Sequence, residues 1–345
     1  SYATMYNPMV LSVNFDYSTQ PAGGSDGTLD ADTAVTGTQG IAKKQPVTLE
    51  KDVNDTNDEK HDIAVGDSIP FIVKTNTPNY GTNYTDPVFT IKDTLSEGLE
   101  MTDKQQGDIV VKNNGNALVK KAEGVTNYDY EITTSKSGYT INFSTAYLLK
   151  IKPNTSVTVE YEATVNAKAV MHNVEEYVND VDLIFSNSPE TTDDSLHDDT
   201  KHYTFSIDAS LLKKEGGDEV TKELVKIGVD AETGEVITSW KTGDTTSWES
   251  ITPLKDAHFT LVRNDDPKYT YEADSDKDGY LTFTGLDAGI YTLTETSAPA
   301  GYKFSKEGVK VEIKAEYNED GTLKNYFVKI NDKYTSTYTA QNEGE

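Results

Sequence analysis

The chain has 345 residues, enough for two domains or slightly more, and its formal net charge of −27 argues against nucleic-acid binding because so acidic a surface repels phosphate backbones. It contains no cysteine, which excludes disulfide bridges, thiolate metal sites and a cysteine nucleophile. No run of about 18 apolar residues occurs, so the sequence predicts no membrane span.

Short runs of alternating apolar and polar residues, separated by turn residues, predict strands along most of the chain. A strand is expected over 9–17, followed by a linker rich in Gly, Ser, Asp and Thr over 20–40. A regular series then follows at 46–53, 68–75, 87–93, 108–112, 127–133, 138–143, 155–166 and 177–186. This spacing, without amphipathic helices between the strands, predicts a β-sandwich.

A polar segment over 188–199 is expected to link this block to a second one. Strands of the second block are predicted at 203–213, 257–263, 269–272, 279–283, 290–296, 308–317, 325–330 and 335–342. They indicate a second, smaller sandwich. The stretch 215–253 is interpreted as an insertion on its flank, in which Trp240 and Trp248 pack the insertion itself. The predicted fold class is all-β, with tandem immunoglobulin-like sandwiches and no more than short helical turns.

Polar residues interrupt the apolar face of three predicted strands in the first block. Successive side chains of a strand point to opposite faces, so residues two apart share a face. The inward sets are Val47, Leu49, Lys51 and Val53; Phe89, Ile91, Asp93 and Leu95; and Tyr177, Asn179, Val181, Leu183 and Phe185. One Lys, one Asp and one Asn are therefore each expected in a core, where a buried charged group needs a partner or a chemical role.

The second block repeats this pattern. Its inward sets are Tyr203, Phe205, Ile207, Ala209, Leu211 and Lys213; Tyr291, Leu293 and Glu295; and Tyr338, Ala340 and Asn342. Lys, acid and Asn follow in the same order in both blocks, and six such residues in a matched pattern argue against chance. Lys214 is an alternative to Lys213 that strand alternation disfavours, and Asn331 is an alternative to Asn342.

A Lys amine and an Asn side-chain carbonyl can form an intramolecular amide, an isopeptide bond, with loss of ammonia. Burial lowers the pKa of the amine and raises the pKa of the acid, so the amine becomes nucleophilic and the acid can donate a proton. A protonated acid beside the pair would polarise the Asn carbonyl and move protons as ammonia leaves. The alternative is a buried Lys–carboxylate ion pair with an Asn hydrogen bond, although burying such a pair is costly. The residues alone leave both open.

Three segments of the second block carry a family resemblance: Pro253 to Leu261, Asp278 to Leu286, and Tyr291 to Thr296 with the Ala298–Tyr302 turn. They resemble the collagen-adhesin B-type (Cna-B) domain of Gram-positive backbone pilins, and the Glu295 segment looks like the E-box of that family. The first block, through Val65–Asp67, Asp93–Leu99 and Asn179–Pro189, resembles the domain that precedes it in such pilins.

The resemblance implies a shaft subunit of a pilus on the cell surface, secreted and anchored to the cell wall. It implies internal isopeptide bonds Lys51–Asn179 and Lys213–Asn342, promoted by Asp93 and Glu295. Residues 1–45 would be the remnant of an N-terminal pilin domain plus linker, 46–201 a Cna-A-like sandwich, and 202–345 a Cna-B-type sandwich with an insertion near 215–253.

The partners implied are further copies of the chain in a head-to-tail covalent polymer, a class C sortase that joins them, and minor pilins. Such pilins usually carry a Tyr-Pro-Lys motif whose lysine receives the neighbouring subunit. This chain has Gly40 to Pro46 there instead, so Lys43 and Lys44 are the positional candidates. The alternative function is a wall-anchored or tip adhesin built from the same domains, with the Trp240/Trp248 insertion as the ligand surface.

Two metal-like patterns are weaker. Asp274, Asp276, Asp278 and Gly279 fit the first half of a calcium-binding EF-hand loop, but a Gly stands where the bidentate Glu is required, and an acidic hairpin turn is favoured. His197 and His202 form a pair without a third ligand. No metal or cofactor is expected, and the only predicted chemistry is single-turnover isopeptide formation, so the chain is not expected to be an enzyme.

Overall fold

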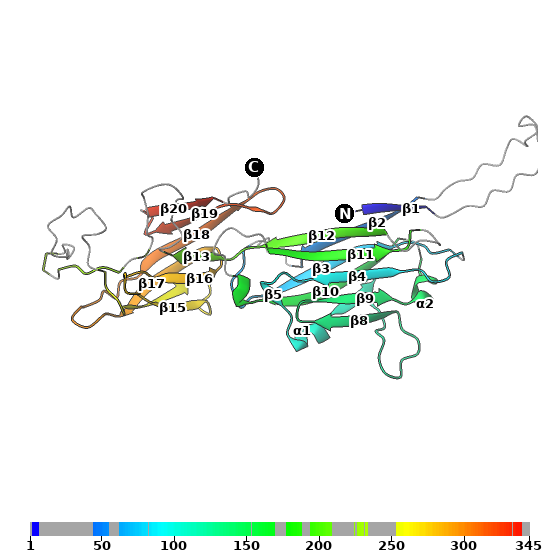
Figure 1. Cartoon of the computed structure of the whole chain (residues 1–345), viewed down its shortest axis with the longest axis horizontal. Helices are drawn as coiled ribbons and strands as arrows, with labels where there is room; N and C mark the ends of the chain where they lie inside the picture. The colour runs from blue at the N-terminus through cyan, green and yellow to red at the C-terminus, as the bar shows by residue number, and fades with distance from the viewer. Residues whose placement is uncertain are drawn as a thin grey trace, which may run out of the picture.

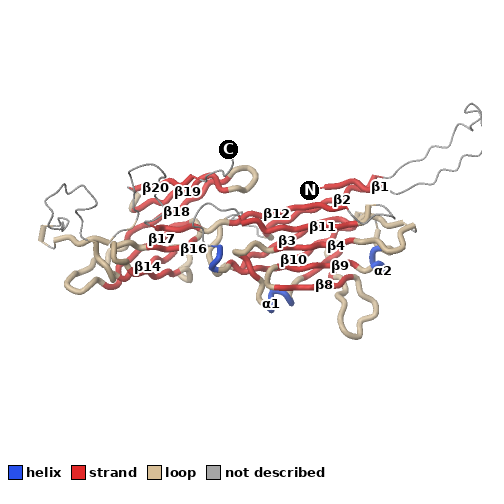
Figure 2. Tube along the Cα trace, in the orientation of Figure 1, coloured by secondary structure: helices blue, strands red, loops and turns tan. Residues whose placement is uncertain are grey.

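The computed structural model describes residues 2–6, 44–54, 62–81, 83–152, 154–169, 177–187, 194–208, 224, 226–230, 232–233, 253–332 and 334–339. Regular structure in these residues is almost all strand (Figure 2), which confirms the all-β prediction. The helices among them are α1 (Asp103–Gly107), α2 (Thr145–Leu148) and the 3₁₀ turn η3 (Ala167–Ala169). None of these helices has the length and apolar character that a membrane span requires.

Two antiparallel sheets build the first block. One has the strand order β1-β2-β3-β10-β6-β7, with β5 paired to β10. Its strands are β1 (Tyr2–Tyr6), β2 (Lys44–Val53), β3 (Ser68–Thr77), β5 (Leu99–Glu100), β6 (Val110–Asn113), β7 (Asn116–Ala117) and β10 (Thr155–Val165). The other has the order β12-β11-β4-β9-β8, with β4 (Phe89–Thr94), β8 (Tyr130–Ser135), β9 (Gly138–Phe143), β11 (Tyr177–Phe185) and β12 (Asp194–His202).

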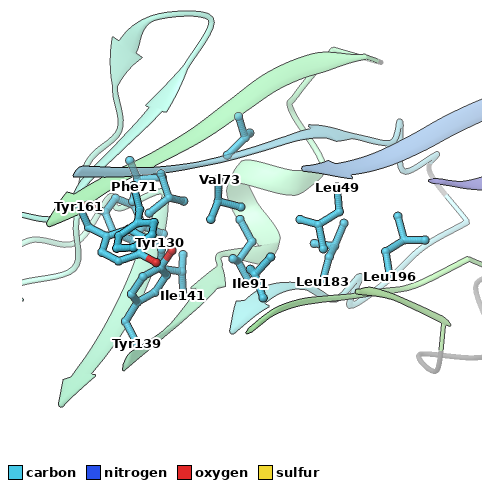
Figure 3. Packing of buried hydrophobic residues seen from close by; sticks show 14 of the residues in the cluster. Leu49, Phe71, Val73, Ile91, Tyr130, Tyr139, Ile141, Tyr161, Leu183 and Leu196 are labelled. Atoms are coloured by element: carbon cyan, nitrogen blue, oxygen red, sulfur yellow. The ribbon is translucent and has the colours of Figure 1, made fainter. Parts of the chain in front are cut away.

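The core of the first block lies between these two sheets. Along β10 the side chains of Val157, Val159, Tyr161 and Ala163 are buried, while residues between them are more exposed. This is the period-two pattern of a strand with one face against a core. Figure 3 shows the side chains from both sheets meeting in one layer, among them Leu49 and Val73 facing Ile91 and Leu183.

The second block contains a sheet with the order β15-β14-β17-β18-β19-β20 and a β13-β16 pair. Its strands are β13 (Phe205–Asp208), β14 (His258–Arg263), β15 (Thr270–Asp274), β16 (Thr282–Leu286), β17 (Gly289–Ser297), β18 (Val309–Tyr317), β19 (Leu323–Ile330) and β20 (Tyr334–Thr339). Phe205, Phe283, Tyr291 and Val311 belong to its separate core. The first core extends to Leu196 and the second begins at Tyr203, while β12 of the first block runs to His202, one residue past the predicted domain boundary between 201 and 202.

The two blocks lie end to end along the molecule (Figure 1) and meet through the loop 62–67. Two backbone hydrogen bonds cross here, from Ile63 N to Tyr203 O at 3.0 Å and from Val65 N to Gly285 O at 3.0 Å. The Tyr317 hydroxyl also donates to Asp62 Oδ1 at 2.8 Å. Backbone and side-chain hydrogen bonds together therefore join the blocks.

One expectation was wrong and others fall outside the described residues. The polar segment 188–199 was predicted as a linker, yet β12 begins at Asp194 and pairs with β11 over nine residues. Cross-strand pairing along β11 outweighed the turn-like composition that suggested a linker. The strand predicted over 9–17, Trp240 and Trp248 lie outside the described residues.

Candidate functional site

Lys51, Asp93 and Asn179 lie on three strands whose inward faces meet in the first core. Their exposed fractions are 4%, 2% and 0%. Lys51 comes from β2 in one sheet, whereas Asp93 and Asn179 come from β4 and β11 in the other. Each has apolar neighbours two residues away on its own strand, which explains why the strand alternation carries it inward.

The three polar groups are in direct contact. The Lys51 amine, Nζ, donates to Asn179 Oδ1 at 2.8 Å and lies 2.9 Å from Asp93 Oδ2. It also lies 3.3 Å from the backbone carbonyl of Asp180. The amine is therefore held against the carbonyl end of the Asn179 amide, with a carboxyl group at its side. This contact brings together the amine and the amide that the predicted bond would join.

Burial drives this pair toward its uncharged form. Desolvation lowers the pKa of Lys51, and the nearby Asp93 only partly opposes it. Desolvation likewise raises the pKa of Asp93, against the opposing effects of Lys51 and Tyr161. A neutral amine has the lone pair that a nucleophile needs, and a protonated carboxyl can donate a hydrogen bond.

Aromatic rings enclose the three groups. The Tyr161 hydroxyl donates to Asp93 Oδ2 at 2.9 Å, and its ring stacks on Phe71 with centroids 5.2 Å apart. Tyr139 packs edge-on against Tyr161 at 5.1 Å (Figure 3). Within the described residues, Asp93 Oδ1 is buried without a hydrogen-bond partner, which is uncommon for a buried polar atom.

Gly138 shapes the backbone beside the acid. Its φ of +142° is unfavourable for residues with a side chain, and a Cβ here would lie 2.1 Å from the Asp93 carbonyl oxygen. Gly138 pairs with the next residue, Thr94, at the end of the β4–β9 ladder. A glycine at this turn therefore lets β9 approach β4 closely, next to the residue that supplies the carboxyl group.

A second acid and lysine meet in the other block, but the lysine differs from the one predicted. Glu295 on β17 is 8% exposed, and its Oε2 accepts a hydrogen bond from Lys226 Nζ at 2.7 Å. The Lys226 amine also lies 5.9 Å from the centre of the Phe259 ring. Lys213 and Asn342 lie outside the described residues. The other oxygen of Glu295, Oε1, is buried and makes no hydrogen bond to any described residue.

Lys226 was overlooked because 215–253 was interpreted as a flanking insertion. The backbone around it belongs to the body of the block, since Lys226 N donates to Gly279 O at 2.7 Å and Leu254 N donates to Lys226 O at 3.0 Å. Lys226 stands two residues after the buried Leu224. The alternation that identified Lys51 could therefore have identified Lys226 as well.

The other candidate residues of the sequence analysis are not part of either Lys–acid pair. Lys43 lies outside the described residues, and Lys44 is the first residue of β2. Asn331 lies in an exposed turn, where its Oδ1 accepts a hydrogen bond from Lys310 N at 3.0 Å. The two histidines have different partners: His197 bonds Asp182, whereas the buried His202 bonds a threonine hydroxyl.

The acidic turn after β15 has the geometry of a self-bonded hairpin. Asp276 Oδ1 accepts hydrogen bonds from the backbone N–H groups of Asp278 at 2.8 Å and Tyr280 at 2.9 Å. This carboxylate therefore closes the turn that leads into β16. The described residues contain no group of three or more His, Asp or Glu placed to hold a metal ion.

Comparison with known families agrees with this architecture. Residues 65–189 match the family described as Gram-positive pilin backbone subunit 2, Cna-B-like domain. Residues 241–327 match the SpaA prealbumin-like fold domain. The first block is thus similar to a domain of Gram-positive backbone pilins, and part of the second is similar to the SpaA domain. These matches confirm the resemblance drawn from the sequence motifs.

Individual relatives of this pilin-type chain are distant. The trypsin-resistant surface T6 protein of Streptococcus pyogenes serotype M6 is 24% identical over 320 residues, which are 89% of this chain. The match covers 52% of that protein, so this chain spans about half the length of the curated relative it matches.

Solved structures show the same fold. The T6 backbone pilin of S. pyogenes serotype M6 superposes with a TM-score of 0.61 at 17% identity, covering 98% of this chain and 74% of that one. The full-length major pilin RrgB of Streptococcus pneumoniae superposes with a TM-score of 0.54 at 13% identity, covering 82% and 75%. At such identities the likeness concerns the fold alone.

Proposed function

We propose that this chain is a structural shaft subunit of a cell-surface pilus, stabilised by autocatalytic Lys–Asn isopeptide bonds inside its domains. The observation that carries the proposal is the buried contact of Lys51 Nζ with Asn179 Oδ1 at 2.8 Å, beside Asp93. The family matches support the backbone-pilin assignment, and backbone pilins are structural proteins rather than enzymes.

The reaction we propose balances without a cofactor. Neutral Lys51 Nζ attacks Asn179 Cγ while protonated Asp93 donates a hydrogen bond to the developing oxyanion. The Nζ–Cγ bond forms and the Cγ–Nδ2 bond breaks. A proton from the Lys51 nitrogen is transferred to the departing nitrogen, which leaves as ammonia, and Asp93 ends as it began. The enclosing rings of Phe71 and Tyr161 keep water from competing.

The proposed bond would join the two sheets of the first block. Lys51 lies on β2 and Asn179 on β11, which belong to different sheets and are 128 residues apart in the chain. A covalent link between them restricts the unfolded chain as a disulfide would. Unlike a disulfide, it resists reducing agents, which suits an extracellular protein that has no cysteine.

For the second block we propose a bond promoted by Glu295, with Asn342 as the acceptor. The contact between Lys226 Nζ and Glu295 Oε2 favours Lys226 over Lys213 as the nucleophile, because the promoting acid must lie beside the reacting amine. Lys226 is also partly shielded from water, with 18% of its side chain exposed. In both blocks the lysine would then meet its acid near an aromatic ring.

The polymer itself is also part of the proposal. Head-to-tail joining of copies by a class C sortase, with minor pilins added and the fibre anchored to the wall, would use a lysine near the start of β2. Lys43 and Lys44 are the candidates. The hydrogen bonds across the 62–67 loop favour a stiff junction between the blocks, as a shaft subunit under tension requires.

Intact-mass measurement and peptide mapping test the internal bonds. The folded protein should be lighter than its sequence by one ammonia for each bond, and the map should contain Lys51 joined to Asn179. Finding the unmodified mass in a folded sample would reject the autocatalytic reaction. The shaft role predicts a ladder of covalent multimers in cell-wall extracts. A single band, or a protein confined to the end of a ladder made by another subunit, would favour the adhesin alternative.

A further inference from the structure

The strand β12 places a threonine and a histidine beside the amide that loses ammonia. Thr200 stands directly opposite Asn179 in the β11–β12 register. Asn179 Nδ2 donates to Thr200 Oγ1 at 3.3 Å, and Thr200 Oγ1 lies 2.9 Å from His202 Nε2. The two ends of the Asn179 amide are thus held by different strands, the oxygen by Lys51 and the nitrogen by Thr200.

The inward row of β12 is polar where the strand passes the reactive groups. Leu196 packs in the core, and the next residues on the same face are Asp198, Thr200 and His202. Asp198 Oδ2 accepts a hydrogen bond from Lys51 N at 2.7 Å, which fixes the backbone of the lysine. His202 is 2% exposed and its ring packs edge-on against Phe71. This row contacts both reacting residues.

We propose that Thr200, oriented by His202, is a positioning residue for isopeptide formation. A hydroxyl can donate or accept, so Thr200 alone would tolerate either orientation of the Asn179 amide. When His202 Nε2 accepts the Thr200 proton, the hydroxyl oxygen must accept from Nδ2. The hydrogen-bond chain then runs from Asn179 through Thr200 to His202, and the amide carbonyl is directed at the Lys51 amine.

This arrangement also separates the attacking and departing nitrogens. Lys51 Nζ lies at the carbonyl oxygen, whereas the nitrogen that becomes ammonia lies against Thr200 on β12, the last strand of its sheet. Thr200 is partly exposed, in contrast to the fully buried Asn179. Ammonia would therefore leave toward β12 and solvent. The inference rests on the proposed isopeptide bond and adds residues to its mechanism.

The test is the rate of bond formation in newly synthesised full chain. Cell-free synthesis is stopped at intervals by denaturation, and the Lys51–Asn179 peptide is measured by mass spectrometry. Thr200→Val should slow the reaction about tenfold, the effect expected from losing one hydrogen bond in the reactive geometry. Thr200→Ser keeps the hydroxyl and should restore the wild-type rate, a rescue that a purely steric role of the threonine methyl would not give.

Thr90→Val is the matched control. It makes the same substitution in the same sheet and removes a Thr–Asn hydrogen bond of 2.9 Å, to Asn142, at an exposed position. It should react at the wild-type rate. Folding of each variant is followed in the same samples by resistance to trypsin. If Thr200→Val fails to fold, His202→Phe replaces it, because this ring still packs but cannot accept the Thr200 proton; it should also slow the reaction.

Two results would overturn the inference. One is a wild-type rate in folded Thr200→Val, or in His202→Phe when it stands in for that variant. The other is a Thr200→Ser rate as low as that of Thr200→Val. Both results can be told apart from failure of the proposed isopeptide bond, because in that case the wild-type chain would itself show no loss of ammonia. If the bond forms in the wild-type chain and forms equally fast in the Thr200 variants, only the positioning role of Thr200 is rejected.

Discussion

Replacing Asp93 with Asn tests the proposed chemistry with little change in shape. The amide has nearly the volume of the carboxyl group and can still hydrogen-bond Tyr161, but unlike a carboxyl group it cannot release a proton to the reacting groups or take one from them. We expect Asp93→Asn to fold without forming the Lys51–Asn179 bond. Its mass at this site should therefore be that of the unreacted sequence, one ammonia heavier than the wild-type peptide pair.

The stability change follows from the length of chain that the bond closes. Lys51 and Asn179 are 128 residues apart. Closing a loop of that length lowers the entropy of the unfolded chain enough to stabilise the fold by about 5 kcal/mol in the chain-entropy account. For a domain of this size, such a loss lowers the melting temperature by about 10–20 °C. A lysine left buried without its acid adds to the loss.

Calorimetry and mass spectrometry on the same samples check this expectation. Asp182→Asn is the matched control, since Asp182 lies on β11 but bonds the exposed His197 instead of the core groups. It should keep both the bond and the wild-type melting temperature. An Asp93→Asn protein that still loses ammonia, or that lacks the bond yet melts with the wild type, would refute this reasoning.

Three further results are expected. In the second block, Glu295→Gln and Lys226→Met should each abolish the proposed isopeptide bond in peptide maps, whereas Lys213→Met should leave it intact. If only Lys213→Met lost the bond, Lys213 would be the nucleophile instead of Lys226. Burial raises the pKa of the Asp287 carboxyl group from 3.8 to about 6, so the folded chain binds the proton of this group more tightly than the unfolded chain does. The stability gained from that proton is present below about pH 4 and is lost as the pH rises through about 6. Asp287→Asn should make the free energy of unfolding, measured with urea, less dependent on pH between about 4 and 6. An unchanged pH dependence would contradict a raised pKa of Asp287. Tyr317→Phe removes a hydrogen bond across the junction between blocks and should lower stability by about 1 kcal/mol in the same urea assay, whereas an unchanged unfolding midpoint would show that the bond contributes little.

Much of the fold followed from the sequence because a strand with one buried face has a side-chain period of two. That period correctly indicated that Lys51, Asp93 and Asn179 are buried, and it separated them from the exposed residues beside them. The turn residues between the runs placed most strand ends within a few residues of those observed. Both signals are local, so they can be read without knowing which strands pair.

Contacts between distant strands needed the tertiary structure. The partner of Glu295 depends on which extended segment packs beside β17, and the structure places Lys226 there from a stretch that looked like an insertion. Similarly, β12 has the composition of a linker, yet pairing with β11 makes it a strand and brings Thr200 to Asn179. Sheet order and register come from packing between residues far apart in the chain. Alternation along one strand therefore predicted which side chains enter a core, and only the assembled sheets determined which groups meet there.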